Sequence, residues 1–325
     1  MKKITIIGFS FLFLLIIIPM IFQAIFLFSS NEEKPQPYSL MNKFDIDSEN
    51  IEELFDEIII YVMRTNTQEI QEILLEDYVV GVVAAEMPAR FESEALKAQA
   101  VAARTYGLRI LRGRDYLYDT VDHQVFKDVY QLEAKWGDGF DYYYNKIRDA
   151  VYATKGLVMK YDDDLIEALF FAMSNGMTEN SEDIFSRNAP YLRSVNSEWD
   201  RNGNNFEVTR TFNLSELRNI FDNRNLMGSS FNIMSLTEAG SVNEVNVGGT
   251  ILTGPEFRRR LGLRSSAFTI ANHIDSIKIT TLGHGHGVGM SQVGANQMAL
   301  MGKDFMEILH HYYQGVNIIQ KRSLD

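Results

Sequence analysis

Residues 75–106 read LEDYVVGVVAAEMPARFESEALKAQAVAARTY, and two consecutive helices follow from this composition. The segment 76–86 is apolar and helix-forming, and Pro88 must end it because proline cannot continue a helix. Ser93 is a suitable N-cap for a second helix over 94–112, which is rich in Ala, Leu, Lys and Arg. We therefore expect two helices joined by a short turn.

On both sides of these two helices in the sequence, patterns typical of strands and patterns typical of helices alternate irregularly. The expected strands are 58–63, 166–171, 242–247 and 274–281. The further expected helices are 215–223, 291–301 and 305–313, the last with a capping box formed by Asp304 and Glu307. Because no regular βαβ repeat is present, the sequence predicts an α+β fold, a single extracytoplasmic domain of mixed structure.

The N-terminus has the pattern of a membrane anchor. Ile4–Phe28 is almost entirely apolar and long enough to cross a bilayer, and Lys2 and Lys3 before it favour a cytoplasmic N-terminus. A cleaved signal peptide is the alternative, but no small-residue cleavage site follows Phe28. The expected organisation is an anchor over 1–30, a polar juxtamembrane linker over 31–57 and a catalytic domain over 58–325, outside the cytoplasmic membrane.

The composition of the chain argues against a nucleic-acid partner and excludes every site that depends on cysteine. The chain of 325 residues carries a formal net charge of −12, which repels phosphate backbones and argues against a nucleic-acid partner. It contains no cysteine, so disulfides, thiolate nucleophiles, cysteine-ligated zinc and iron–sulfur clusters are all excluded.

Glu86 is the first candidate for a catalytic group. It ends an apolar run two residues before Pro88, and apolar surroundings raise the pKa of a carboxyl group. A raised pKa is what a general acid working near neutral pH requires. The alternative is a glutamate at the end of a helix that simply reaches solvent.

The second expected helix carries two cations. Lys97 and Arg104 are seven residues apart and therefore share one face, where the alanines between them would let a ligand approach closely. They could orient Glu86 and hold substrate oxygens. The alternative is an amphipathic helix with solvated charges.

Two polar turns are further candidates. Gly283–Gly289 alternates glycine with other residues before a helix, without the spacing of a dinucleotide-binding loop or a P-loop. His284 and His286 could ligate a metal, but no third ligand lies nearby in sequence, so we expect no metal and favour a hydrogen-bonding role for His286. Ser174-Asn175-Gly176 suits sugar hydroxyls and amides, or is an ordinary turn.

Taken together, these segments resemble the stage II sporulation protein D family. The matching stretches are 75–88, 95–106, 174–180, 190–200 and 285–292, in unchanged order between about Ile58 and Gly315. Two positions depart from the expected pattern, since Met177 and Val293 stand where a polar or aromatic residue is expected. Some relatives have a zinc site built from Cys and His, which a chain without cysteine cannot form in that way.

The resemblance implies a lytic transglycosylase of spore-forming bacteria that remodels septal peptidoglycan during engulfment. Its implied partners are glycan strands stripped of peptides, a wall amidase and a polytopic membrane protein, and it implies no cofactor. Glu86 is the implied catalytic acid and base. The expected substrate-binding residues are Lys97, Arg104, Tyr106, Ser174, Asn175, His286, Ser291 and Gln292.

Two other functions remain open from the sequence. The chain could be a non-catalytic glycan-binding scaffold that activates a wall amidase, or a metal-dependent wall hydrolase using His284 and His286. A hydrolase with carboxylate chemistry would need a second carboxyl group besides Glu86, for which Glu94 and Glu179 are the nearest candidates.

Overall fold

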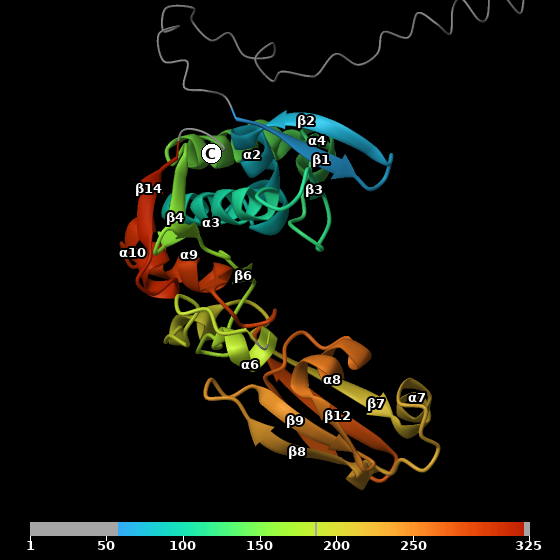
Figure 1. Cartoon of the computed structure of the whole chain (residues 1–325). Coiled ribbons are helices and arrows are strands. Elements are labelled where there is room, and N and C mark those ends of the chain that lie inside the picture. The colour runs from blue at the N-terminus through green and yellow to red at the C-terminus, as the bar shows by residue number, and fades with distance from the viewer. Residues whose placement is uncertain (1–57, 186, 322–325) are drawn as a thin grey trace, which may run out of the picture. The chain divides into compact units, whose positions relative to one another are not determined.

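The computed structural model describes residues 58–185 and 187–321, and the expected anchor and linker lie outside these ranges. Within the described ranges, no helix is both long enough and apolar enough to cross a bilayer. Helices and strands are mixed along the chain, as Figure 1 shows, so the α+β expectation is confirmed.

The helices are α2 (Leu75–Glu86), α3 (Ser93–Leu111), α4 (Val129–Trp136), α5 (Phe140–Tyr152), α6 (Ser181–Phe185), α7 (Leu214–Ile220), α8 (Gly254–Leu261), α9 (Gln292–Leu300) and α10 (Phe305–Tyr312). Short 3-10 turns are η2 (Gly137–Gly139), η3 (Glu198–Asn202) and η4 (Gly228–Ser230). The capping box of α10 is present, with Asp304 and Glu307 each accepting from the other's backbone N–H.

The strands are β1 (Ile59–Arg64), β2 (Glu69–Leu74), β3 (Leu117–Tyr118), β4 (Leu157–Tyr161), β5 (Asp164–Leu165), β6 (Phe170–Phe171), β7 (Glu207–Asn213), β8 (Phe231–Leu236), β9 (Val242–Val247), β10 (Thr250–Thr253), β11 (Phe268–Asn272), β12 (Ser276–Leu282), β13 (Met290–Ser291) and β14 (Asn317–Gln320). They form small sheets in the orders β2-β1-β3, β14-β4-β5, β10-β9-β8 and β11-β12-β7, with β6 and β13 pairing in parallel.

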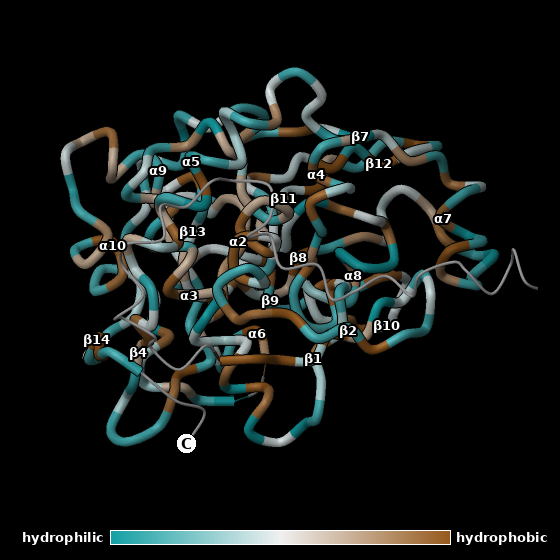
Figure 2. The backbone as a smooth tube through the Cα atoms, turned by 90° about the horizontal axis from the view of Figure 1, so that it is seen from above, coloured by the Kyte–Doolittle hydropathy of each residue, from teal (hydrophilic) through white to brown (hydrophobic). Residues whose placement is uncertain are grey.

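α3 lies at the centre of the helical part and packs against α2, α5, α9 and α10. Its alanines, among them Ala98 and Ala102, are fully buried between these helices. In Figure 2 the tube around α2 is mostly brown, in line with the valines that α2 turns into the same core. The small side chains thus bring helices together, whereas the sequence had suggested an open face for a ligand.

The segment 206–282 forms a second core of its own. Its buried residues come from β7 to β12 and from α7 and α8, and they include Phe212, Phe231, Phe257 and Ile279. The chain enters and leaves this segment at one place, since Gly283 N donates to Phe206 O at 2.8 Å.

The predicted strand over 166–171 was wrong for most of its length. Only Phe170 and Phe171 are in a strand, β6, because the preceding residues leave β5 and run towards Tyr191. The apolar residues Ile166 and Ala168 are still buried. The hydrophobic pattern therefore identified residues of the core correctly but did not indicate strand pairing.

Candidate functional site

Glu86 is the last residue of α2, and its side chain is half-buried. Val125 N donates a hydrogen bond to Glu86 Oε1 at 2.9 Å. Burial raises the pKa of the Glu86 carboxyl, and the Val125 N–H opposes this because it stabilises the ionised form. The carboxyl group is therefore partly accessible to solvent, and burial shifts its pKa upwards.

Gly81 explains how the Val125 loop comes so close to α2. A Cβ at Gly81 would lie 2.4 Å from Phe126 Cε2 and 2.5 Å from Lys127 O. A side chain at this position would push the loop away, although alanine is the better helix former. The glycine therefore helps to set the distance between Glu86 and Val125.

Arg64 on β1 holds both ends of the same loop. Its Nε lies 3.2 Å from Asp119 Oδ2, and its Nη2 lies 2.9 Å from Asp128 Oδ2. Its guanidinium also covers the ring of Phe126 at 4.9 Å. Arg64 is 6% exposed, so this is a buried clamp on the loop that contacts Glu86.

Two tyrosines and a glutamine complete the surroundings of Glu86. Tyr78 OH donates to Gln124 Oε1 at 3.2 Å, and Tyr106 and Glu86 are close enough to help raise the pKa of Tyr78. Burial is the main cause for Tyr78 and raises the pKa of Tyr106 as well. Both phenols therefore stay protonated near neutral pH. Tyr106, an expected site residue, therefore shares Tyr78 as a neighbour with Glu86.

Gln124 and Val125 were not predicted from the sequence. Gln124 is 2% exposed, and its Nε2 has no hydrogen-bond partner within the described ranges. Its loop is positioned by contacts with β1 and α2, which are distant in sequence, so no local pattern could have identified either residue.

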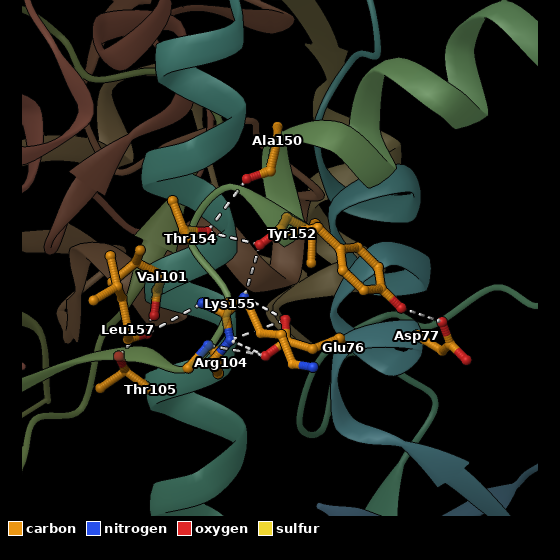
Figure 3. A network of polar contacts seen from close by, with 12 residues as sticks. Glu76, Asp77, Val101, Arg104, Thr105, Ala150, Tyr152, Thr154, Lys155 and Leu157 are labelled. Carbon is orange, nitrogen blue, oxygen red and sulfur yellow. Dashed lines mark hydrogen bonds and ion pairs between the residues drawn. The ribbon is translucent and has the colours of Figure 1, made fainter. Parts of the chain in front are cut away.

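Arg104 lies in the interior, and Figure 3 shows its contacts. Its Nε and Nη2 donate to Glu76 at 2.9 and 2.5 Å, Nη1 donates to Leu157 O at 3.1 Å, and Nη2 donates to Val151 O at 3.2 Å. The side chain is 0% exposed. This corrects the expectation of a substrate contact, because a guanidinium enclosed in the core cannot meet a polymer.

Lys97 is paired within its own helix. Its Nζ lies 2.6 Å from Glu94 Oε1, and Glu94 Oε2 accepts from Phe305 N at 2.9 Å. The ammonium is therefore directed to the start of α10, and the predicted approach to Glu86 has no contact to support it among the described residues.

Ser174 and Ser291 meet at a buried carboxylate. Asp200 accepts from Ser174 N at 2.8 Å, from Ser291 Oγ at 2.9 Å and from Ser197 Oγ at 3.2 Å. Ser291 also caps α9 by accepting from Gly294 N. Burial raises the pKa of Asp200, and these serines oppose it. The two expected contact residues thus hold the fold together around Asp200.

Asn175 and Gln292 are also engaged within the protein. Asn175 Nδ2 donates to Ala239 O at 2.9 Å, and its Oδ1 accepts from Met177 N at 3.1 Å. Gln292 Nε2 donates to Gln99 Oε1 at 3.3 Å and is 6% exposed. Only Asn175 of this pair keeps appreciable exposure.

His286 is braced between aromatic rings. The ring centroids of Phe171 and Phe185 lie 5.5 and 5.4 Å from that of the imidazole, and Val288 N donates to Nδ1 at 3.1 Å. Burial lowers the pKa of His286 to about 4, so the ring is neutral at pH 7. His284 is exposed instead, and among the described residues no three His, Asp or Glu side chains are arranged to hold a metal ion.

The glycines around His286 serve internal packing. A Cβ at Gly289 would lie 2.1 Å from Leu169 O, and one at Gly283 would lie 2.6 Å from Met173 O. Both have positive φ angles, which glycine adopts without strain. The loop therefore packs against the chain before the Ser174 turn, where the sequence had suggested close approach to a ligand.

Comparison with known proteins shows the family of the chain. Residues 63–161 match the family described as stage II sporulation protein. The chain is 42% identical to stage II sporulation protein D of Bacillus amyloliquefaciens over 272 residues, 81% of this chain and 79% of the relative. It is also 42% identical to the protein of that name from Bacillus subtilis (strain 168) over 271 residues, 80% of this chain and 79% of the relative. A more distant relative from that strain, named amidase enhancer, is 28% identical over 296 residues, 73% of this chain and 40% of the relative. The chain therefore belongs to the stage II sporulation protein D family.

Proposed function

We propose that this sporulation-family protein is a lytic transglycosylase that cuts the glycan strands of peptidoglycan, with Glu86 as acid and base. The observation that carries the proposal is the half-buried Glu86 carboxyl, whose raised pKa has burial as its main cause. Of the other carboxylates suggested by the sequence, one is ion-paired and one is too buried for a polymer to reach. Glu94 pairs with Lys97, and Glu179 is 2% exposed.

A single carboxyl group suits this reaction. Protonated Glu86 gives its proton to the glycosidic oxygen as the bond from C1 of N-acetylmuramic acid to that oxygen breaks. The carboxylate then takes the proton of the C6 hydroxyl of the same muramyl unit, and O6 bonds to C1 to close a 1,6-anhydro ring. No water is consumed, and because the nucleophile is part of the substrate its entropic cost is small. A hydrolase would need a second carboxyl group to activate water.

The neighbours of Glu86 fit the same proposal. Tyr106 is partly exposed and remains a neutral hydroxyl group, which can donate a hydrogen bond to a sugar oxygen or to the carboxylate without adding charge. Tyr78 is 0% exposed and supports the Gln124 loop from the interior. Among the predicted contacts, we retain Tyr106 and Asn175 as candidates for substrate binding. We assign Arg104, Ser174, Ser291, Gln292 and His286 to the support of the fold.

We also propose that the N-terminal apolar segment anchors the domain outside the cytoplasmic membrane. Lys2 and Lys3 precede the apolar run Ile4–Phe28, which supports this orientation. The mature protein should keep its own N-terminus, and added protease should reach residues after Ser30 in spheroplasts. N-terminal sequencing that begins near Asn31 would contradict the anchor.

The catalytic assignment is tested by Glu86→Gln with Glu92→Gln as the matched control, since Glu92 is exposed. Glu86→Gln should lower cleavage of wall sacculi by about 100-fold or more, because an amide cannot transfer the proton. Glu92→Gln should cleave at the wild-type rate. Mass spectrometry of the wild-type products should find 1,6-anhydromuramic ends. Ordinary reducing ends would indicate a hydrolase, and a fully active Glu86→Gln protein would end the assignment.

A second candidate function is activation of a wall amidase, and the relative named amidase enhancer favours it. The same purified variants discriminate between the two functions when a wall amidase is added. If wild type and Glu86→Gln stimulate the amidase equally and neither releases soluble glycan fragments, the protein is a scaffold.

A further inference from the structure

An aromatic cluster lies where α4 ends and α5 begins. The ring centroids of Trp136 and Tyr143 are 5.7 Å apart, and those of Tyr142 and Tyr143 are 5.4 Å apart. Tyr142 is 68% exposed, and Trp136 and Tyr143 are partly exposed. The three adjoining rings form a contiguous aromatic patch, and contiguous apolar patches mark ligand or partner sites more often than single exposed apolar groups do.

This cluster is tied to the chain on both sides of Glu86. Lys135 Nζ donates to Ala84 O at 2.9 Å, two residues before Glu86. Lys146 Nζ donates to Phe91 O at 2.6 Å, five residues after it. Because the two lysines belong to α4 and α5, the aromatic rings are held beside the C-terminal end of α2.

The rings are also held rigidly. Phe140 stacks on Tyr144 with a centroid distance of 5.2 Å, and both are buried beneath the cluster. Gly139 leaves room for Tyr143, since a Cβ there would lie 3.0 Å from Tyr143 Cε2. A surface that is already ordered loses little conformational entropy on binding.

Positive charge accompanies the rings. Lys135 Nζ lies 5.5 Å from the ring centroid of Trp136. Burial lowers the pKa of Lys135, and the nearby ammonium of Lys127 lowers it further. Within residues 58–185 and 187–321, neither lysine takes part in an ion pair. The protein has a net charge of −12, so a pair of neighbouring lysines without a carboxylate partner, Lys127 and Lys135, favours an anionic ligand.

We propose that Trp136, Tyr142 and Tyr143 form a binding subsite for pyranose rings of the glycan strand, next to the scissile bond. Aromatic faces stack against the C–H faces of a sugar, and a polymer cut at Glu86 must extend beyond that residue. Lys127 and Lys135 would attract the carboxylate of a muramyl unit, so the expected ligand is an N-acetylated sugar acid. This inference rests on the proposed glycan substrate and adds the residues that hold it.

Binding is measured on the full-length Glu86→Gln protein in detergent, so that no cleavage interferes. The chain has two tryptophans, and Trp199→Phe leaves Trp136 as the remaining fluorophore. The probes are peptide-free strands of alternating N-acetylglucosamine and N-acetylmuramic acid, and the neutral tetramer of N-acetylglucosamine. Strands should change the Trp136 fluorescence on saturation. They should bind more tightly than the tetramer at low salt, and added salt should reduce this difference.

Titration calorimetry then compares ring variants in the Glu86→Gln background with Trp199 retained. Trp136→Ala should weaken strand binding about tenfold, which is the scale of one good aromatic contact. Trp136→Phe should recover most of the affinity. Tyr61→Ala is the matched control, since Tyr61 is 43% exposed on β1, and it should bind like its parent.

Strand affinity unchanged by Trp136→Ala, or an unresponsive Trp136 fluorophore, would overturn the subsite. Failure of the proposed function would look different. In that case Glu86→Gln would still release glycan fragments, while the ring variants would still differ from their parent in strand binding. If the parent protein binds no strand at all, both proposals fail.

Discussion

Among the carboxylates of α2, Glu76 near the start and Glu86 at the end have different environments. Glu76 at the start is held by the guanidinium of Arg104, so it has a permanent positive partner. Glu86 at the end accepts from the neutral N–H of Val125, and burial raises the pKa of its carboxyl group. A carboxylate with a buried cation beside it is a structural group. A carboxyl group with only a neutral donor can exchange a proton, so the environment of Glu86 fits the proposed role better than that of Glu76.

His286 gives a prediction at the same scale. Its pKa of about 4 in the folded protein lies below the ordinary 6.5, so the unfolded chain binds a proton over the range in which the folded protein does not. Stability should therefore fall as pH falls from about 7 to about 4, by at most about 3 kcal/mol from this group. Denaturant unfolding of wild type and His286→Gln at several pH values measures the difference. Equal pH slopes for the two proteins would contradict the burial of this ring.

Single residues also show what a sequence can and cannot reveal about a site. Glu86 became a candidate because its apolar neighbours and Pro88 are local in sequence, and the resemblance to the family implied its role. Arg104 was misjudged, because helical spacing gives the face on which a residue lies but not whether another element covers it. Gln124 gave no signal at all, since its position depends on β1 and α2 together.

At the scale of elements, α3 is the support for its neighbours. Arg104 of α3 donates hydrogen bonds to Glu76 at the start of α2 and to Leu157 at the start of β4, as Figure 3 shows. It also donates to Val151 O near the end of α5. Helices with clear local signals, such as α2 and α3, were predicted within one or two residues. The β1–β2 hairpin was predicted only in its first strand. β2 is mostly exposed, so its residues lack the alternation of a half-buried strand.

Arg104→Met tests this support. It would leave Glu76 without its cation, so the free energy of unfolding should fall by about 3–5 kcal/mol, the usual effect of breaking a buried ion pair. Arg112→Met is the control, because the ion pair of Arg112 with Asp164 is exposed and should contribute less than about 1 kcal/mol. Urea denaturation measures both. Similar losses in the two variants would refute the distinction between the buried and the exposed pair.

At the scale of the whole described chain, the segment 206–282 is an insertion between two halves of the helical part. It enters and leaves at neighbouring residues, because Gly283 N donates to Phe206 O. Glu86 and the polar groups around it all lie outside the segment. The sequence showed strands here at 242–247 and 274–281 but not a separate core. Which faces of those strands pack together depends on pairings such as β12 with β7, which are distant in sequence.

The insertion should therefore fold by itself. Phe257 is 0% exposed and packs on Phe221, Phe231 and Phe268, with ring centroids 5.1 to 6.5 Å away, so these ring contacts lie within 206–282.

A fragment of roughly 80 residues with one core should be stable by only a few kcal/mol, because so small a domain buries a limited area. We expect cooperative urea unfolding of the isolated fragment 206–283 with a dispersed amide spectrum. Phe257→Ala should unfold it, since losing such a side chain costs about 3–5 kcal/mol. Met234→Ala, at a residue 55% exposed on β8, should change little. A fragment that unfolds without cooperativity, while the intact protein unfolds cooperatively, would mean that the core depends on the helical part.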